Sequence, residues 1–213
     1  MHKFFIKTPW IVKKIFSSYV WNMPRDEKTI YLSFDDGPHP EITPFVLDEL
    51  RKYNAQASFF CVGENVVLYP EAYKQILEEG HVVGNHTYSH PNGWKTKAED
   101  YWRDISKASH YIESNLFRPP YGRIKMGQAN GLKKAMNNND ARIIMWDVLS
   151  ADFDTKFSPR QCFCNVVNNC TNGSIVVFHD SEKAFPNLKY SFPKALKKLS
   201  EEGYIFKRIE GLK

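Results

Sequence analysis

Long hydrophobic runs are missing from this sequence. The longest apolar stretch near its start is Trp10-Ile11-Val12, which Lys13 and Lys14 interrupt at once. A membrane-spanning helix needs about 20 apolar residues, and the apolar region of a signal peptide needs about 7–15. The sequence therefore predicts neither a membrane span nor a signal peptide, and we expect a cytoplasmic location.

Cysteine is scarce, with four residues among 213. Cys162, Cys164 and Cys170 form a C-x-C-x5-C pattern, which lacks the paired C-x2-C spacing of common structural zinc sites. We interpret them as structural thiols of a reduced compartment, on one face of a helix or in a loop. A zinc or disulfide cluster is the alternative, and the sequence leaves their role open.

An excess of one charge is also missing from most of the chain. There are 29 Lys and Arg against 24 Asp and Glu, a net charge of +5. Residues 1–28 hold six basic and two acidic residues, so they carry +4 of this charge. The remainder is nearly balanced, whereas a nucleic-acid-binding protein usually has a basic face across its body. We therefore expect no nucleic-acid partner, and the sequence does not determine an oligomeric state.

What the sequence does contain is typical of a folded protein, since 42% of its residues are hydrophobic and 15% aromatic. Residues 9–21 have the pattern of an amphipathic helix, with Pro9 in its first turn and Pro24 after its end. This helix could pack on the domain, or it could lie as a basic helix on the anionic inner face of a membrane. We divide the chain into this N-terminal extension, residues 1–28, and one catalytic domain, residues 29–213.

From residue 29 onward, short β-rich segments alternate with helical patterns. Strands are expected at residues 29–34, 57–62, 81–84, 115–118, 141–146, 174–178 and 204–208. Helices are expected near residues 44–53, 70–79, 97–114, 128–138, 158–169 and 191–202. Seven strands that alternate with helices indicate an α/β fold with parallel strands, one strand short of the eightfold barrel.

Ionisable residues follow five of these strands. In a parallel barrel the carboxyl ends of all strands meet at one rim, where functional side chains are usually carried. We therefore expect these residues to gather at that rim. They are Asp35 and Asp36, His86 and His90, Arg118, Asp147 and Asp152, and His179 and Asp180.

Two histidines and a carboxylate among these residues are a candidate metal site. His86 and His90 are four residues apart, so both face one point if a helical turn starts there. A carboxylate from Asp35 or Asp36 would complete a set of two histidines and one aspartate. Three protein ligands leave positions open for water and substrate, as in catalytic zinc sites.

The remaining groups suit acid–base chemistry. Asp35 and Asp36 point in different directions if the backbone is extended, so one can bind the metal while the other accepts a proton from water. Arg118 could keep that base ionised, and His179 could protonate a leaving group. Asp152 would raise the pKa of His179. A structural ion-pair network is the alternative for Arg118 and Asp152.

These segments resemble, in the same order, five motifs of the polysaccharide deacetylase family, also called the NodB-homology domain or carbohydrate esterase family 4. The resemblance covers about residues 29–209. The matching segments are residues 33–38 (SFDDGP), 86–90 (HTYSH), 118–122 (RPPYG), 147–153 (DVLSADF) and 177–179 (VFH).

The resemblance implies a distorted (β/α)7-type barrel and one divalent metal ion, usually zinc. It assigns the metal to Asp36, His86 and His90. It also implies a general base, Asp35, oriented by Arg118; an oxyanion-hole backbone N–H from Tyr121; and a general acid, His179, tuned by Asp152.

Two positions depart from the family pattern. Phe153 stands where the family often has Trp, and Val177 where it often has Leu. Both are apolar, and we expect them to line the pocket for the acetyl methyl group. The aromatic residues expected near the rim could stack on sugar faces, with packing in the core or at the rim as the alternative; they are Tyr88, Trp94, Tyr121 and Phe153.

The resulting prediction is metal-dependent hydrolysis of the acetamide of an N-acetylglucosamine-containing glycan, with release of acetate. Peptidoglycan, chitin-type oligomers and a cell-surface glycan precursor all fit. Two alternatives stay open: a deacetylase or amidohydrolase of a small non-glycan amide on the same scaffold, and a non-catalytic carbohydrate-binding protein.

Overall fold

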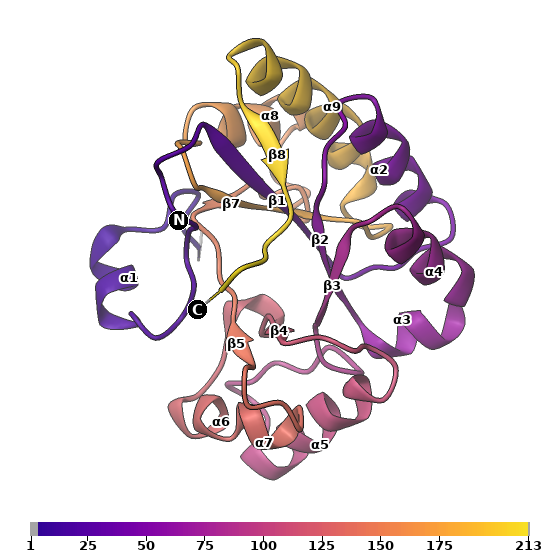
Figure 1. Ribbon diagram of the computed structural model, residues 1–213, viewed down its shortest axis with the longest axis vertical. Helices are drawn as coiled ribbons and strands as arrows, with labels where there is room; N and C mark the ends of the chain where they lie inside the picture. Colours follow the sequence, from indigo (N-terminus) through magenta and orange to yellow (C-terminus); the bar gives the residue numbers. More distant parts are fainter. Residues whose placement is uncertain (1–3, 213) are drawn as a thin grey trace.

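The computed structural model describes residues 4–212, and its centre is one curled sheet with the helices around its outside (Figure 1). The strand order is β5-β4-β3-β2-β1-β7-β6, β8 pairs with β1, and all these pairs are parallel. This confirms the predicted α/β architecture. The strands are β1 Thr29–Asp35, β2 Ser58–Cys61, β3 Val82–Asn85, β4 Leu116–Phe117, β5 Arg142–Ile143, β6 Val148–Leu149, β7 Ile175–His179 and β8 Ile205–Lys207.

Hydrophobic side chains fill both sides of the sheet, because successive residues of a strand point to opposite faces. On the outer face, the ring of Phe34 in β1 lies 5.0 Å from that of Phe59 and 5.1 Å from that of Phe192, which comes from a covering helix. Phe60, the next residue of β2, belongs instead to a second cluster with Leu116, Ile144 and Ile175. The curled sheet thus has a filled interior, and functional groups are left to its rim.

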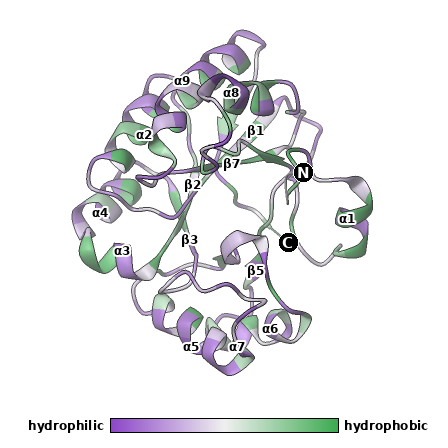
Figure 2. Cartoon of the chain, turned by 180° about the vertical axis from the view of Figure 1, so that it is seen from behind, coloured by the Kyte–Doolittle hydropathy of each residue, from purple (hydrophilic) through white to green (hydrophobic). Residues whose placement is uncertain are grey.

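The helices that cover the sheet alternate between hydrophobic and hydrophilic stretches, as amphipathic helices do (Figure 2). They are α1 Trp10–Ile15, α2 Ile42–Arg51, α3 Gly63–Leu68, α4 Pro70–Glu78, α5 Ala98–Ser109, α6 Met126–Asn130, α7 Leu132–Ala135, α8 Pro159–Val167 and α9 Phe185–Glu201, with a short 3₁₀ turn at Pro120–Gly122. Each of the seven predicted strands and of the six predicted helical segments after residue 29 overlaps an element of the predicted type.

The N-terminal segment lies along the edge of the sheet where the path of strand pairing ends. Lys7 forms an antiparallel bridge with Val148 of β6, and the amide of Leu149 donates to the carbonyl of Ile6 at 2.8 Å. Further along, Val20 forms a parallel bridge with Ile144, just beyond β5. Backbone hydrogen bonds therefore join the extension to both ends of the strand path.

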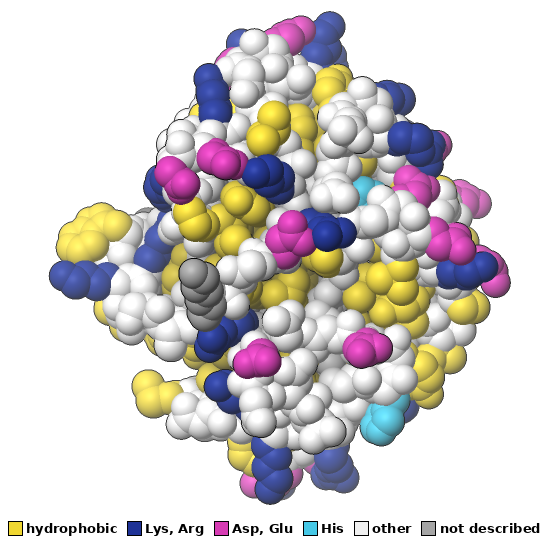
Figure 3. All heavy atoms as spheres, viewed as in Figure 1, with side chains coloured by type: hydrophobic (Ala, Val, Ile, Leu, Met, Phe, Trp, Pro, Cys, Tyr) yellow, Lys and Arg dark blue, Asp and Glu magenta, His cyan; other side chains and the backbone are white. Residues whose placement is uncertain are grey.

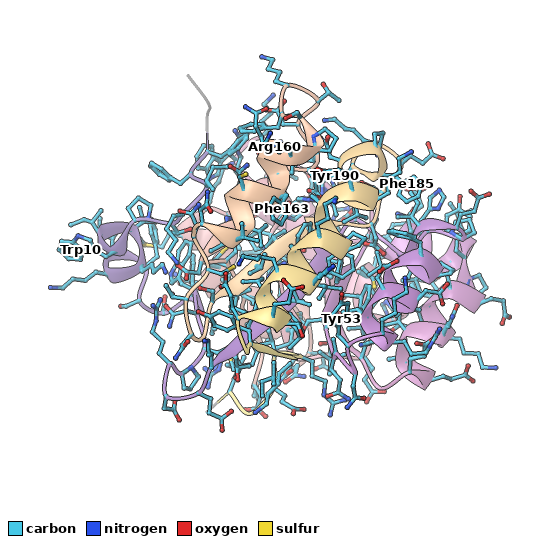
Figure 4. All side chains as sticks on the ribbon, turned by 90° about the horizontal axis from the view of Figure 1, so that it is seen from above. Trp10, Tyr53, Arg160, Phe163, Phe185 and Tyr190 are labelled. Carbon is cyan, nitrogen blue, oxygen red and sulfur yellow. The ribbon has the colours of Figure 1, made fainter. Side chains whose placement is uncertain are left out.

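The helix expected over residues 9–21 is much shorter in the structure, where α1 ends at Ile15. The helical periodicity gives way because Val20 takes part in a backbone bridge and Trp21 is buried. Trp10 and Ile15 are 70% and 68% exposed. Figure 4 shows Trp10 at the outer end of α1, pointing away from the body of the protein.

None of the helices within residues 4–212 is both long and apolar enough to cross a membrane. The four cysteines are free thiols. Cys162 and Cys164 lie two positions apart on α8 and therefore on different sides of it, so the expectation that they share a helical face is wrong. Cys162 is fully buried, and no cysteine in the described part of the chain belongs to a cluster that could hold a metal ion.

Candidate active site

The candidate metal ligands come from the loops that follow β1 and β3, which flank β2 in the sheet. The Oδ1 atom of Asp36 lies 3.1 Å from Nε2 of His90 and 3.6 Å from Nε2 of His86. One ligand atom from each residue lies within 4.8 Å of the others, close enough to hold one metal ion. The structure thus brings together the three residues that the sequence predicted.

The protonation states of these ligands suit a cation. Nδ1 of His86 donates to the backbone carbonyl of Arg118 at 2.7 Å, an assignment that leaves the Nε2 lone pair facing Asp36. Burial lowers the pKa of His86 to about 4, so its imidazole is neutral at pH 7. Burial by itself would raise the pKa of Asp36, but the hydrogen bond from His90 and the nearby imidazoles lower it well below its usual range. Two imidazoles and one carboxylate fit a divalent ion such as zinc.

The backbone conformation that produces this arrangement differs from the one that the sequence predicted. Residues 86–90 form no helical turn: Thr87 and His90 have φ angles of 66° and 57°. The Asn85 side chain accepts from the Thr87 amide at 2.8 Å, and the Thr87 hydroxyl accepts from the His90 amide at 3.1 Å. Asp36 has a φ of 80°, so the extended backbone assumed for this aspartate is also wrong. Residues in the left-handed region of backbone conformation, held by local hydrogen bonds, therefore direct the ligand side chains towards one another.

Asp35 is clamped from inside the barrel by a fully buried arginine. Arg118 donates to Oδ1 of Asp35 at 2.5 Å and to the hydroxyl of Ser33 at 2.9 Å. Its guanidinium also donates to the carbonyls of Ile144 and Met145, which fix its plane. The ion pair keeps one oxygen of Asp35 engaged and fixes the orientation of the carboxylate. The sequence predicted the pair, but it did not identify Ser33 as part of the clamp.

His179 and Asp152 form a second ion pair. Nδ1 of His179 lies 2.8 Å from Oδ1 of Asp152, whose other oxygen accepts from the His179 backbone amide at 2.9 Å. Burial by itself would lower the pKa of His179, but the charge and the hydrogen bond of Asp152 outweigh it and raise the pKa to about 9. The imidazole is therefore protonated at pH 7, and its other nitrogen can donate. His179 is opposite Asp35 in the register of β1 and β7.

The expected pocket residues lie around these pairs. The ring of Phe153 is 4.9 Å from that of His179, and Val177 lies two positions before His179 on the same face of β7. Tyr121, with a φ of 60°, is 60% exposed, and its ring lies 4.7 Å from that of His90.

The two other aromatic candidates differ in their surroundings. Trp94 is 60% exposed, with the Arg123 guanidinium 5.0 Å from its ring, so it is free to meet a ligand. Tyr88 instead packs between Lys107 and Tyr111, on the side of helix α5. Tyr88 is therefore a packing residue in this structure.

Asp147 lies at the opposite end of the sheet, which corrects the expectation that it belongs to the rim. Asp147 precedes β6, and it accepts hydrogen bonds from the hydroxyl of Ser174, which precedes β7, at 2.6 Å and from the ammonium of Lys7 at 2.7 Å. The fifth predicted strand ends at Ile143 rather than at residue 146, and Asp147 instead leads into β6. Only the later Asp152 reaches the site.

Asp180 is a site residue to which the sequence assigned no role. Its buried carboxyl accepts from the amide of Gly37 at 3.1 Å and from the hydroxyl of Thr43 at 2.5 Å. Burial raises its pKa to about 7. A Cβ on Gly37 would lie 2.2 Å from a carboxylate oxygen of Asp180, so only glycine allows this contact. Asp180 therefore ties the loop next to Asp36 to the start of α2.

The protein is thus a parallel α/β barrel with an Asp-His-His cluster beside two buried ion pairs. This arrangement is typical of a class of hydrolases. The profile of the family described as polysaccharide deacetylase matches residues 22–139, more than half of the chain, and the chain belongs to this family. This confirms the resemblance seen in the sequence.

Curated relatives support the same assignment. A peptidoglycan-N-acetylglucosamine deacetylase of Bacillus cereus is 36% identical over 81% of this chain and 62% of its own length. A second protein of that name from the same organism is 34% identical over 90% of this chain and 91% of its own length. A peptidoglycan-N-acetylglucosamine deacetylase of Listeria monocytogenes is 33% identical, and the match spans 39% of its length.

The fold has a close counterpart among solved structures. The Bc1960 peptidoglycan N-acetylglucosamine deacetylase superposes with a TM-score of 0.82 at 32% identity, over 93% of this chain and 94% of that one. The distorted (β/α)7-type barrel expected from the resemblance is therefore confirmed.

Proposed function

We propose that this protein is a metal-dependent hydrolase that removes acetyl groups from N-acetylglucosamine residues of a glycan, of the peptidoglycan or chitin-oligosaccharide type. The observation that carries the proposal is the placement of two buried ion pairs, Asp35 with Arg118 and His179 with Asp152, beside the Asp36 cluster. One pair orients a carboxylate and the other holds a protonated imidazole, and amide hydrolysis needs a base and an acid of these kinds.

In this proposal Asp36, His86 and His90 hold the metal ion, for which zinc fits the donor set. The bound ion would supply Lewis-acid polarisation of the acetamide carbonyl and a more acidic water. Asp35 accepts the proton of the attacking water at its carboxylate, while Arg118 keeps that carboxylate oriented.

His179 then protonates the departing nitrogen at its Nε2 atom, so the glucosamine leaves as an amine and acetate is released. Asp152 fixes the tautomer of His179 through Nδ1 and stabilises the imidazolium before the transfer. We assign the backbone N–H of Tyr121 to the developing oxyanion. Phe153 and Val177 would enclose the acetyl methyl group, and the exposed ring of Trp94 offers a stacking surface to a neighbouring sugar.

We further propose that α1 contacts an anionic membrane surface. Trp10, Ile11 and Ile15 are at least 49% exposed, and the ammonium of Lys14 lies 5.9 Å from the centre of the Trp10 ring. In Figure 3, hydrophobic and basic side chains meet at the tip of this projection. An exposed Trp beside lysines is typical of helices that lie at the lipid interface.

The test is acetate release from N-acetylglucosamine oligomers of increasing length and from peptidoglycan fragments, with metal-stripped protein and added zinc. We expect zinc-dependent release that grows with oligomer length, and loss of about 100-fold or more in kcat for Asp35→Asn. Release from small non-glycan amides alone would favour the small-amide alternative. Glycan binding without any turnover would favour a binding protein.

A further inference from the structure

The N-terminal segment forms an isolated antiparallel bridge to β6, next to the half of the site that holds the general acid. Hydrogen bonds from Leu149 to Ile6, at 2.8 Å, and from Thr8 to Asp147, at 2.9 Å, place residues 6–8 antiparallel to β6. Since β6 leads directly into Asp152 and Phe153, the antiparallel direction carries the start of the chain towards the rim. These residues precede the segment that the family profile matches.

Phe4 is the residue that reaches the site. The centre of its ring lies 5.3 Å from that of Phe153 and 6.2 Å from that of Phe157, so it packs on the loop that follows β6. Phe153 in turn lies 4.9 Å from the imidazole of His179, with the two rings at 63°. A chain of three rings, tilted between Phe4 and Phe153 and edge-to-face between Phe153 and His179, therefore connects the N-terminal segment to the proposed general acid.

A buried ion cluster around Asp147 fixes the N-terminal segment at and beyond Lys7. The carboxylate of Asp147 is fully buried and accepts from both Lys7 and Lys13, with Arg25 at 3.6 Å. Burial by itself would raise the pKa of Asp147, but the hydrogen bonds from the two lysines lower it. Three basic residues of the extension thus converge on one carboxylate of the body, which sets the register of this segment and with it the position of Phe4.

From these contacts we infer that Phe4 is a positioning residue of the acyl pocket: it holds the ring of Phe153 against His179 and so sets the size of the acyl group accepted. This inference rests on the proposed deacetylase function. It also makes residues 4–8 a part of the catalytic unit, although they lie within the predicted extension.

The test compares Phe4→Ala with Phe5→Ala as a matched control, because Phe5 is the adjacent residue and is 59% exposed. We expect Phe4→Ala to lower kcat/KM for N-acetylated oligomers by about tenfold and to reduce the preference for acetyl over propionyl groups by a similar factor. Phe4→Leu should restore most of both values. Phe5→Ala should match the wild type within about twofold.

Two outcomes would overturn the inference. One is a Phe4→Ala enzyme that keeps the wild-type kcat/KM and acyl preference. The other is an equal loss for acetyl and propionyl substrates that follows a lower melting temperature and that Phe4→Leu does not restore.

A readout without turnover separates this inference from the proposed function. The ring of Phe153 shifts the proton resonances of the His179 imidazole, so we expect these resonances to move in Phe4→Ala and to stay in place in Phe5→Ala. If the wild type released no acetate from any glycan, the proposed function would fail. Unchanged His179 resonances in Phe4→Ala would then overturn the positioning role on their own.

Discussion

At the scale of single residues, two carboxylates of the site differ in the basic group that each one contacts. Asp35 faces a guanidinium that is permanently charged, whereas Asp152 faces an imidazole whose charge depends on pH. The first arrangement maintains a base, and the second maintains an acid. The pH dependence of the reaction should therefore report on His179.

We expect kcat/KM to fall as the pH rises through about 9, where His179 loses its proton. Asp152→Asn removes the charge that raises this pKa, so the alkaline limb should move towards 6.5 and activity at pH 7.5 should drop by about tenfold. The measurement is the pH profile of kcat/KM for the wild type and the variant. Asp140→Asn, at an exposed position, is the control. An alkaline limb that stays near 9 in Asp152→Asn would contradict this assignment.

The same pair also links folding to pH. Because the folded-state pKa of about 9 lies above the ordinary 6.5, the pair stabilises the fold fully below pH 6.5. This contribution declines as the pH rises and is lost above 9.

Asp180 should act on stability and on metal affinity together. Asp180→Ala leaves the Gly37 amide and the Thr43 hydroxyl without their acceptor, at a cost of about 1–3 kcal/mol in the free energy of unfolding. Since the same loop carries Asp36, zinc affinity should also fall. Asp180→Asn retains one acceptor and should lose less of both. Denaturant unfolding and zinc titration measure the two effects, and equal losses in both variants would argue against this role.

Single residues also mark how far the sequence could predict the site. Asp36, His86 and His90 could be predicted because their motifs are local. Ser33 and Asp180 could not, because their partners lie 85 and 143 positions away in the chain. Hydrogen bonds at such separations depend on the register of the finished sheet.

At the scale of elements, the sequence identified most strands and helices but missed two short ones, β6 and α3. The strands and helices with clear periodicity were identified, whereas β6 has two residues and α3 has six. Neither is long enough for a hydrophobic period to be recognised. The expected helix over residues 9–21 failed for the opposite reason: its periodicity was clear, but backbone pairing to Ile144 overrode it.

The α1 projection should affect membrane binding and leave the chemistry unchanged. Replacing Trp10 and Ile15 by Ser removes two exposed apolar side chains, so sedimentation with vesicles of anionic phospholipid should fall by about tenfold. Acetate release from soluble oligomers should stay at the wild-type rate. Replacing the exposed Leu68 and Met126, which lie on other elements, is the matched control. Equal sedimentation of both double variants would remove the membrane proposal.

At the scale of the whole molecule, the alternation of strands and helices was sufficient to predict a parallel barrel. It was not sufficient to predict what covers the edge strand β6. Residues 6–8 pair with β6, although more than 130 residues separate the two segments in the sequence. No periodic pattern carries information about contacts of that kind.

Metal binding should stabilise the whole domain. Zinc at about 100 times its dissociation constant adds about 2.7 kcal/mol to the stability, which raises the melting temperature by about 5–10 °C for a chain of this size. We expect this shift on adding zinc to stripped protein and no shift in His86→Ala, which removes one of the three proposed ligands. A scanning calorimeter measures both. An equal shift in the variant would place the zinc elsewhere.

The pairing of residues 6–8 with β6 also determines when the N-terminal segment can dock during synthesis. Leu149, whose amide donates to Ile6, is made 143 residues after it. The N-terminal segment therefore cannot pair with β6 until most of the barrel has been translated. Because loop closure over such a distance is slow and entropically costly, the docking of this segment is expected to be a late event in folding. Nascent chains stopped before β6 would carry six residues of the site, from Asp35 to Tyr121, but they would lack Phe153 and Phe157, on which Phe4 packs.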